Sequence, residues 1–280
     1  WEEGTGRGLG APSGAPARSA RFRHMRHCYV LRVFTRNGEG GNHLGVIPDV
    51  TGLTRDGMQS IATELGFSET VFLDWREGGN PYARIFTPAT ELPFAGHPLV
   101  GAAWVLTRMG PGGPDCIECG VGDVGIRNVG TATWIDPPFD QTVSPPSSEA
   151  GERLGAIHAC EVAMPLPYLV LELRSPQDVS VIGRPPDDGF VYVWAWEERG
   201  QRIRARFFAR EHGVVEDPAT GSAAVAFAAS MRERGQPSGS VVIHQGQEMG
   251  YPSRIELTWD EQGVHVGGEV ARVEVRVLDV

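Results

Sequence analysis

The chain has 280 residues, 41% of them hydrophobic and 21% charged, with a formal net charge of -10. This is the composition of an ordinary globular protein with one large domain or two smaller ones. The acidic balance disfavours nucleic acid and membrane surfaces as partners, so we expect a small-molecule ligand. The sequence contains no lysine, and all 25 residues in the Lys+Arg count are arginines. Pyridoxal-phosphate, Schiff-base and P-loop chemistry, which depend on a lysine, are therefore excluded.

The cysteines are too few for a disulfide framework and favour the cytoplasm. The pair in Cys116-Ile-Glu-Cys119 has the spacing of a zinc or redox site. The sequence has no second Cys pair that could complete a zinc site, so we interpret this segment as the end of a strand with reduced thiols and expect no metal site. No apolar run approaches the ~18 residues that a membrane-spanning helix needs.

In chain order, residues 1–24 are rich in Gly, Ala, Pro and Arg and are predicted to be a flexible tail or a vector-derived segment. Our hypothesis is that the native chain begins at Met25. Short β-rich runs follow, broken by turns. The predicted strands are Cys28–Phe34, Thr70–Trp75, Ala83–Phe86, Tyr168–Leu173, Phe190–Trp196, Arg204–Phe208, Val241–His244, Arg254–Trp259 and Val270–Leu278.

Three segments predict helices. Thr54–Leu65 is amphipathic. Pro98–Arg108 and Ala223–Arg232 are apolar on every side, and such a helix must be wrapped by other structure. With strands before and after each of them, we expect an α+β fold of two pseudo-symmetric domains. Each domain would be a curved sheet or barrel around a central apolar helix.

The Pro/Ser-rich stretch after Asp136 separates the two apolar helices and is the best candidate for a linker. We expect an N-terminal domain over 25–137, a linker over 138–152 and a C-terminal domain over 153–267, with the last strand, 268–280, completing the first domain. The run from Arg84 through Glu91 to Gly96-His97 parallels the run from Arg206 through Glu211 to Gly221-Ser222. This parallel predicts a diverged internal repeat.

Both apolar helices open with a glycine and a polar residue, in Gly96-His97-Pro98 and in Gly221-Ser222. Proline is expected at the first helical position and Ser222 as a cap. If two similar domains face each other, the free N–H groups of both helix starts converge on one cleft that can hold a carboxylate or an enolate. Ordinary helix caps are the alternative.

Several longer motifs resemble one known family, the PhzF-like isomerases of phenazine biosynthesis. The resemblance runs from about His27 to the C-terminus. Its motifs are Asn42 in Gly41-Asn42-His43-Leu44, Ser68-Glu69-Thr70, the run from Arg84 to Pro98 (RIFTPATELPFAGHP), the run from Val215 to Ala224 (VEDPATGSAA), Gln245-Gly246 and Gly250-Tyr251-Pro252-Ser253.

The resemblance implies a diaminopimelate-epimerase-like fold, which agrees with the wrapped-helix interpretation. It also implies cofactor-free isomerisation of trans-2,3-dihydro-3-hydroxyanthranilate or a related acid, in phenazine-like or other antibiotic metabolism, by a homodimer. By the same resemblance Glu69 is the general acid/base. The other implied catalytic residues are His97, Asp217 and Ser222, and the implied substrate-binding residues are Asn42, Gly96 and Gly221.

A carboxylate that accepts a proton from carbon and returns it should be partly desolvated, so we expect Glu69 to have a raised pKa. Related epimerases place a cysteine before each helix-start glycine, where this chain has Ala95 and Thr220. A two-thiol racemase is therefore excluded. A serine hydrolase is disfavoured because Ser222 lacks the flanking Gly-x-Ser-x-Gly pattern.

Two questions stay open at this point. His43 stands where the family commonly has proline, which leaves the substrate undetermined. A non-catalytic small-molecule-binding protein on the same fold is the second hypothesis, and the retained Glu69 argues against it.

Overall fold

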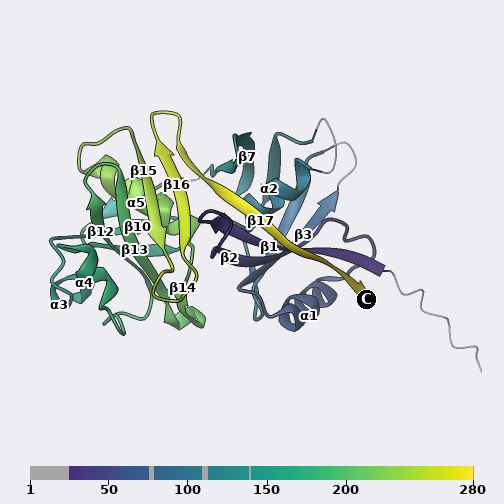
Figure 1. The fold of residues 1–280 in the computed structure, drawn as a ribbon, viewed down its shortest axis with the longest axis horizontal. Helices are drawn as coiled ribbons and strands as arrows, with labels where there is room; N and C mark the ends of the chain where they lie inside the picture. Colours follow the sequence, from purple (N-terminus) through teal and green to yellow (C-terminus); the bar gives the residue numbers. More distant parts are fainter. Residues whose placement is uncertain (1–24, 76–78, 109–112, 139, 280) are drawn as a thin grey trace, which may run out of the picture.

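The computed structural model describes residues 25–75, 79–108, 113–138 and 140–279, which form two lobes (Figure 1). The predicted tail, residues 1–24, lies outside the described residues. Each lobe is a sheet curved around one buried helix, α2 in the first lobe and α5 in the second. The predicted two-domain α+β fold is confirmed.

The strands of the first lobe form a closed ring around α2. The order is β1–β2–β3–β4–β6–β7–β8–β17, and β17 pairs again with β1. The bounds of the elements in this lobe are β1 Met25–Thr35, β2 Asn42–Ile47, α1 Arg55–Leu65, β3 Glu69–Trp75, β4 Pro81–Phe86, β5 Glu91–Leu92, α2 Gly96–Leu106, β6 Cys116–Cys119, β7 Gly122–Val129 and β8 Ala132–Asp136.

The two helices of this lobe differ as their sequences predict. In α2 every residue is buried except the half-buried Trp104, because strands surround the helix. In α1 one face, with Met58, Ile61 and Ala62, packs on the outside of the barrel. The hydroxyl of Thr54 caps α1 by accepting from the N–H of Gly57 at 3.1 Å.

The second lobe repeats this topology around α5. Its strands run β9–β10–β11–β12–β13–β15–β16–β17, and β14 pairs with β13. The bounds are β9 Thr142–Ser144, α3 Ala150–Arg153, β10 His158–Ala163, β11 Pro167–Glu172, α4 Pro176–Ser180, β12 Phe190–Glu198, β13 Arg202–Ala209, the 3-10 helix η1 Arg210–His212, β14 Val214–Asp217, α5 Gly221–Glu233, β15 Gly239–Gln245, β16 Ser253–Trp259 and β17 Val264–Asp279.

The internal repeat is visible in the strand pairing. In both lobes a strand turns into a short antiparallel strand, the buried helix follows, and the next strand pairs in parallel with the first. The guanidinium of Arg84 binds the carboxylate of Glu91 at 2.7 Å, and Arg206 binds Glu216 in the same way at 2.8 Å. The counterpart of Glu91 is therefore Glu216. Our expectation of Glu211 was wrong, because Glu211 lies in η1, before the short strand begins.

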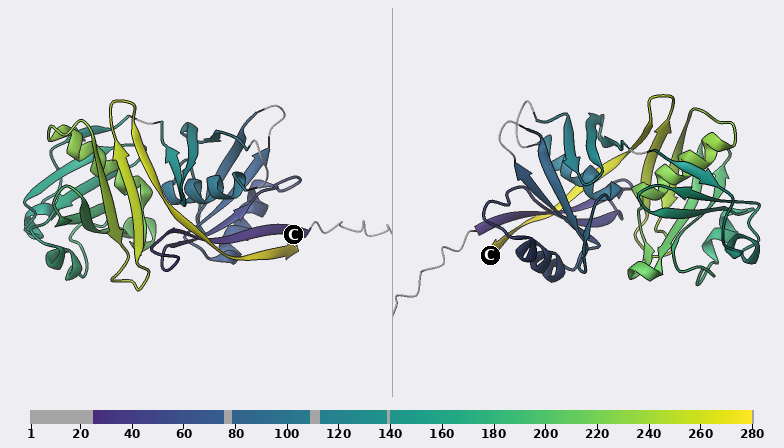
Figure 2. Two further views of the ribbon diagram at one scale, coloured as in Figure 1. Left: turned by 45° about the horizontal axis from the view of Figure 1, so that its top comes forward. Right: turned by 180° about the vertical axis from the view of Figure 1, so that it is seen from behind.

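The lobes are joined by the segment after β8 and by β17. The Pro/Ser-rich segment contains β9, which pairs with β10. β17 begins in the second lobe beside β16, contacts β8 and then runs along β1 to the end of the described chain (Figure 2). The segment from Cys116 to Cys119 forms a strand, β6, as predicted, and all four cysteines are free.

Candidate active site

The two buried helices begin against each other. A Cβ atom placed on Gly96 would lie 3.0 Å from the Cα of Gly221, and one placed on Gly221 would lie 3.2 Å from the Cα of Gly96. Such contacts are tighter than most real Cβ contacts, so a side chain at either position would push the two helix starts apart by a few tenths of an ångström, and glycine at both positions permits the close approach. The predicted convergence of the two helix N-termini is observed.

The helix caps differ from those we expected. Each chain segment is extended up to the residue before the glycine, so the caps are Ala95 and Thr220, and neither makes a side-chain capping bond. Pro98 is the third helical residue and Ser222 the second, because both helices begin two residues earlier than predicted. The N–H groups of the first turns have no partner within their own helices and can bind an anion at the junction.

Glu69 and His97 face each other beside this junction. Glu69 is the first residue of β3 and His97 the second of α2, and Oε2 of the glutamate lies 3.4 Å from Nε2 of the histidine. The Glu69 side chain is 17% exposed and that of His97 is 4% exposed.

Burial controls the charge of both groups. It raises the pKa of Glu69 to about 8, and the nearby carboxyl group of Asp217 acts in the same direction, while a hydrogen bond with Ser68 opposes the rise. Burial lowers the pKa of His97 to about 3, so the imidazole is neutral at physiological pH. Glu69 can therefore both hold and release a proton near neutrality.

Asp217 ends β14 and is bound from both lobes. Its carboxylate accepts a hydrogen bond from Nδ2 of Asn42 in the first lobe at 2.7 Å and another from the hydroxyl of Thr220. Nε2 of Gln245 donates to the main-chain oxygen of Asp217 at 2.8 Å. Burial raises the pKa of Asp217 to about 6, and the hydrogen bonds from Thr220 and Asn42 oppose the rise.

Asn42 connects the acidic groups of the site. Besides binding Asp217, its Nδ2 lies 3.4 Å from Nδ1 of His97. Its Oδ1 accepts a hydrogen bond from Ser68, the neighbour of Glu69, at 3.0 Å. A substitution at Asn42 would therefore disturb Glu69, His97 and Asp217 together.

Ser222 is bound by a tyrosine. The hydroxyl of Tyr168, in β11, donates to Oγ of Ser222 at 2.8 Å. Burial raises the pKa of Tyr168 to about 12, and the charges of Asp217 and Glu69 add to the rise, so the phenol stays protonated and acts as a donor. The structure gives Ser222 no hydrogen bond to His97, and this arrangement is not that of a nucleophile with its base.

The structure thus gathers all seven predicted site residues: Asn42, Glu69, Gly96, His97, Asp217, Gly221 and Ser222. It also adds Tyr168, Thr220 and Gln245, to which the sequence analysis gave no role in the site. Gln245 belongs to a motif of the family resemblance. Tyr168 opens an apolar strand and has the pattern of a core aromatic residue, so nothing in the sequence distinguishes it.

His43, where the family commonly has proline, lies between the two lobes. Its ring stacks on Phe67 with centroids 5.9 Å apart and meets the edge of Tyr251, from the second lobe, at 6.0 Å. Burial and the charge of Arg32 lower the pKa of His43. The imidazole therefore contributes a neutral, aromatic contact between the lobes.

Comparison with known proteins agrees with this geometry. Residues 31–151 and 175–277 match the family described as phenazine biosynthesis-like protein, PhzC-PhzF. The chain belongs to the PhzF family. A relative from Pseudomonas chlororaphis, named trans-2,3-dihydro-3-hydroxyanthranilate isomerase, is 32% identical over 82% of this chain and 88% of its own.

Solved structures show the same fold for this PhzF-family isomerase. A PhzF-family protein from Bacillus anthracis superimposes with a TM-score of 0.79 at 19% identity, covering 92% of this chain and all of the other. A protein from Pseudomonas aeruginosa, titled a predicted epimerase, superimposes with a TM-score of 0.76 at 29% identity and the same coverage.

Two further observations on this PhzF-family chain concern metal binding and membrane-spanning helices. Within the residues that the structure describes, no group of three His, Cys, Asp or Glu side chains is placed to hold a metal ion. Within the same residues, no helix is long and apolar enough to cross a membrane.

Proposed function

We propose that this PhzF-family isomerase moves a proton between two carbon atoms of a small cyclic or unsaturated carboxylic or amino acid, without a cofactor. Glu69 is the group that accepts and returns the proton. The observation that carries the proposal is the carboxyl group of Glu69, buried against the neutral His97 with a pKa raised to about 8. A carboxyl group with this pKa transfers protons in both directions near neutral pH.

The reaction begins with binding of the substrate carboxylate by the first-turn N–H groups at Gly96 and Gly221. The Glu69 carboxylate removes a proton from one carbon, and the electron pair of the broken C–H bond spreads into the conjugated system. The helix N-termini stabilise the negative charge that develops on the substrate. The protonated Glu69 exchanges its proton with solvent and then delivers a proton to a second carbon, so the product is an isomer, the enzyme is unchanged and deuterium enters from heavy water.

The residues around Glu69 position the reacting groups. His97 contacts Glu69 but does not hold it in the ionised form, because an imidazole with a pKa of about 3 stays neutral throughout the reaction. Asn42 and Thr220 orient Asp217. The hydroxyl of Ser222 accepts a hydrogen bond from Tyr168 and supplies a polar contact for the substrate at the start of α5.

Relatives named trans-2,3-dihydro-3-hydroxyanthranilate isomerase support a cyclic amino acid as the substrate class and a role in phenazine-like or other antibiotic metabolism. The four free thiols favour a reducing compartment, and we assign the activity to the cytoplasm.

The proposal is tested by isotope exchange. The protein is incubated in heavy water with trans-2,3-dihydro-3-hydroxyanthranilate and with a panel of cyclic unsaturated amino acids, and deuterium on carbon is followed by NMR. At least one substrate gains deuterium and isomerises with the parent protein. Glu69→Gln slows both processes by at least about 100-fold, the scale of lost acid/base catalysis. Glu64→Gln, an exposed glutamate on α1, serves as the matched control and leaves the rate unchanged.

Two results would contradict the proposal. Equal rates of exchange by the parent protein and Glu69→Gln would show that Glu69 does not carry the proton. Tight binding of a panel acid with neither exchange nor isomerisation would support the non-catalytic binding protein instead.

A further inference from the structure

The two lobes contact each other outside the active site through two loops, one between β1 and β2 and the other between β15 and β16. The N–H of Gly41 donates to the main-chain oxygen of Pro252 at 3.3 Å. Gly40 has a φ of 65°, and a Cβ atom placed on it would overlap the same oxygen. The loop of the second lobe is therefore packed directly against the loop of the first.

The ring of His43 extends this contact along the first lobe. It stacks on Phe67 with centroids 5.9 Å apart, and Tyr251 of the second-lobe loop meets it edge-on at 6.0 Å. Phe67 packs with the residues that bury one face of α1, and the guanidinium of Arg276 lies 5.5 Å from its ring centroid. His43 thus joins a well-packed aromatic side chain of its own lobe to an aromatic side chain of the other lobe.

On the first-lobe side, this contact leads directly to the reacting groups. Phe67 and Ser68 are the two residues that precede Glu69. The hydroxyl of Ser68 lies 3.4 Å from the main-chain oxygen of His43. The imidazole of His97 is hydrogen-bonded to the main chain of the same residue. The position of His43 therefore affects both Glu69 and His97.

On the second-lobe side, the contact leads to Asp217. The N–H of Tyr251 donates to the main-chain oxygen of Gly246 at 3.0 Å. A Cβ atom placed on Gly246 would overlap the main-chain oxygen of Tyr251 and lie 2.6 Å from that of Pro218. The neighbouring Gln245 donates to the main-chain oxygen of Asp217 at 2.8 Å. A displacement of the Tyr251 loop would therefore reach Asp217 through two close contacts.

Asn42 forms the inner part of the same joint between the lobes. Its Nδ2 donates to the carboxylate of Asp217 at 2.7 Å. The charge of Asp217 helps to raise the pKa of Glu69, and such an effect weakens as the distance between two groups grows. Because His43 directly follows Asn42, loss of the outer contact would let the inner contact widen.

We propose that His43 is a positioning residue for the two carboxyl groups of the active site. Its ring, held between Phe67 and Tyr251, keeps the segment that ends in Glu69 aligned with the second-lobe loop that packs on Asp217. Its effect on rate rests on the proposed function, whereas the alignment is a property of the protein without substrate. A neutral aromatic ring is sufficient for this role.

Titration of Glu69 in the substrate-free protein tests the alignment without any reaction. Glutamate labelled with ¹³C in the side-chain carboxyl group is followed by NMR, and Glu69→Gln identifies the signal. In His43→Ala the midpoint moves to lower pH, because burial and the charge of Asp217 both raise the pKa of Glu69 and a wider joint weakens both. His43→Phe keeps the ring contact and titrates like the parent protein.

Isotope exchange tests the effect on rate. In His43→Ala the limiting kcat/KM above the midpoint falls about tenfold, because Glu69 is no longer held in the productive geometry. Tyr251→Leu has the same effect, and the double variant is no slower than either single variant, since both residues act through one contact. His43→Phe restores the rate and the pH profile of the parent.

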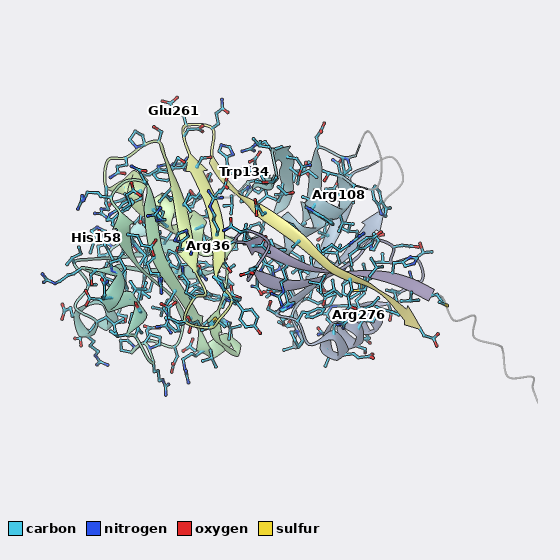
Figure 3. All side chains as sticks on the ribbon, viewed as in Figure 1. Arg36, Arg108, Trp134, His158, Glu261 and Arg276 are labelled. Atoms are coloured by element: carbon cyan, nitrogen blue, oxygen red, sulfur yellow. The ribbon has the colours of Figure 1, made fainter. Side chains whose placement is uncertain are left out.

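His158→Ala is the matched control. His158 is a half-buried histidine on β10, and Figure 3 shows it at the end of the second lobe that is remote from the first. This variant leaves the Glu69 titration and the exchange rate unchanged. Thermal unfolding shows that each variant is folded. If His43→Ala does not fold, His43→Leu takes its place, since it retains apolar volume without an aromatic ring.

Failure of this inference is distinguishable from failure of the proposed function. If no acid of the panel exchanges with the parent protein, the proposed function fails, and the Glu69 titration still decides the positioning role. An unchanged midpoint in folded His43→Ala would overturn that role. Equal shifts in His43→Ala and His43→Phe would also overturn it, because the ring contact would then not be the cause. A similar shift in His158→Ala would show only general destabilisation and would contradict the role as well.

Discussion

His97 and Glu69 meet at the junction of the two lobes, with Nε2 and Oε2 3.4 Å apart and no hydrogen-bond partner for either atom among the described residues. With a pKa of about 3 for His97 and about 8 for Glu69, both side chains are neutral at pH 7. Ionisation of Glu69 creates a buried negative charge that the imidazole does not neutralise. The site therefore holds Glu69 ready to lose its proton to solvent and to regain one from substrate.

The pH dependence of exchange follows from this arrangement. Removal of a proton from carbon requires the Glu69 carboxylate, so kcat/KM for deuterium exchange rises about tenfold per pH unit below pH 8 and levels off above it. Ser68→Ala removes a hydrogen bond that favours the ionised form, and the midpoint moves to higher pH. A profile that is flat from pH 5 to pH 9, measured by NMR in buffered heavy water, would show that Glu69 does not limit the rate.

Stability should depend on pH in two opposing ways. The folded pKa of Glu69 lies above its ordinary value of 4.5, so between about pH 4.5 and 8 the folded state binds more protons and stability falls as pH rises. The folded pKa of His97 lies below 6.5, so between about pH 3 and 6.5 the unfolded state binds more protons and stability rises with pH.

Glu69→Gln separates these two effects. The variant removes the carboxyl group and is more stable than the parent at pH 8 by about 4 kcal/mol, with the difference vanishing near pH 4.5. Urea unfolding at a series of pH values measures it, and Glu64→Gln, on the exposed face of α1, gives the baseline. A pH-independent difference would mean that the pKa of Glu69 is not raised in the folded protein.

The contact between the two helix starts makes Gly96 and Gly221 sensitive positions. In Gly96→Ala the new methyl carbon would lie 3.0 Å from the main chain of Gly221, and the helices must separate. We expect a loss of about 1–3 kcal/mol in the free energy of unfolding and weaker binding of carboxylate ligands. Gly57→Ala in α1 is the control, since its Cβ meets only ordinary contacts, and it should gain about 0.5–1 kcal/mol. Chemical denaturation and ligand titration distinguish the two variants.

The hydrogen bond from Tyr168 to Ser222 can be tested against a second buried tyrosine. Tyr168→Phe leaves Oγ of Ser222 without its donor, and we expect it to lower kcat/KM for exchange about tenfold, or roughly 1.4 kcal/mol. The hydroxyl of Tyr192 is buried without a hydrogen-bond partner in the described chain. Tyr192→Phe should therefore leave the rate unchanged and preserve or raise stability. Equal effects of both substitutions on the exchange rate would show that Tyr168 has no specific role in the active site.

The local pattern of the sequence determined much of the architecture. The residues of α2 and α5 are apolar on every side, and such helices can be stable only inside other structure, so the wrapped helices followed from periodicity alone. The motifs around Glu69, His97, Asp217 and Ser222 identified the candidate site. The helix starts were misplaced by two residues, because Ala95 carries no capping signal and the hydroxyl of Thr220 donates to Asp217 without capping its own helix.

Only the tertiary structure decided which distant groups meet. The raised pKa of Glu69 was expected on chemical grounds, but the neutral His97 and the nearby Asp217 depend on burial and on contacts between the lobes. Tyr168 entered the site for the same reason, since a core tyrosine and a donor to Ser222 have the same sequence pattern. The pairing of β17 with β1, which leaves Val273 to Val277 exposed, is a contact between the first and last strands of the described residues. The hydrophobic periodicity of a segment predicts which face of a helix or strand each residue occupies. Which residues from distant parts of the chain contact that face is decided by tertiary packing.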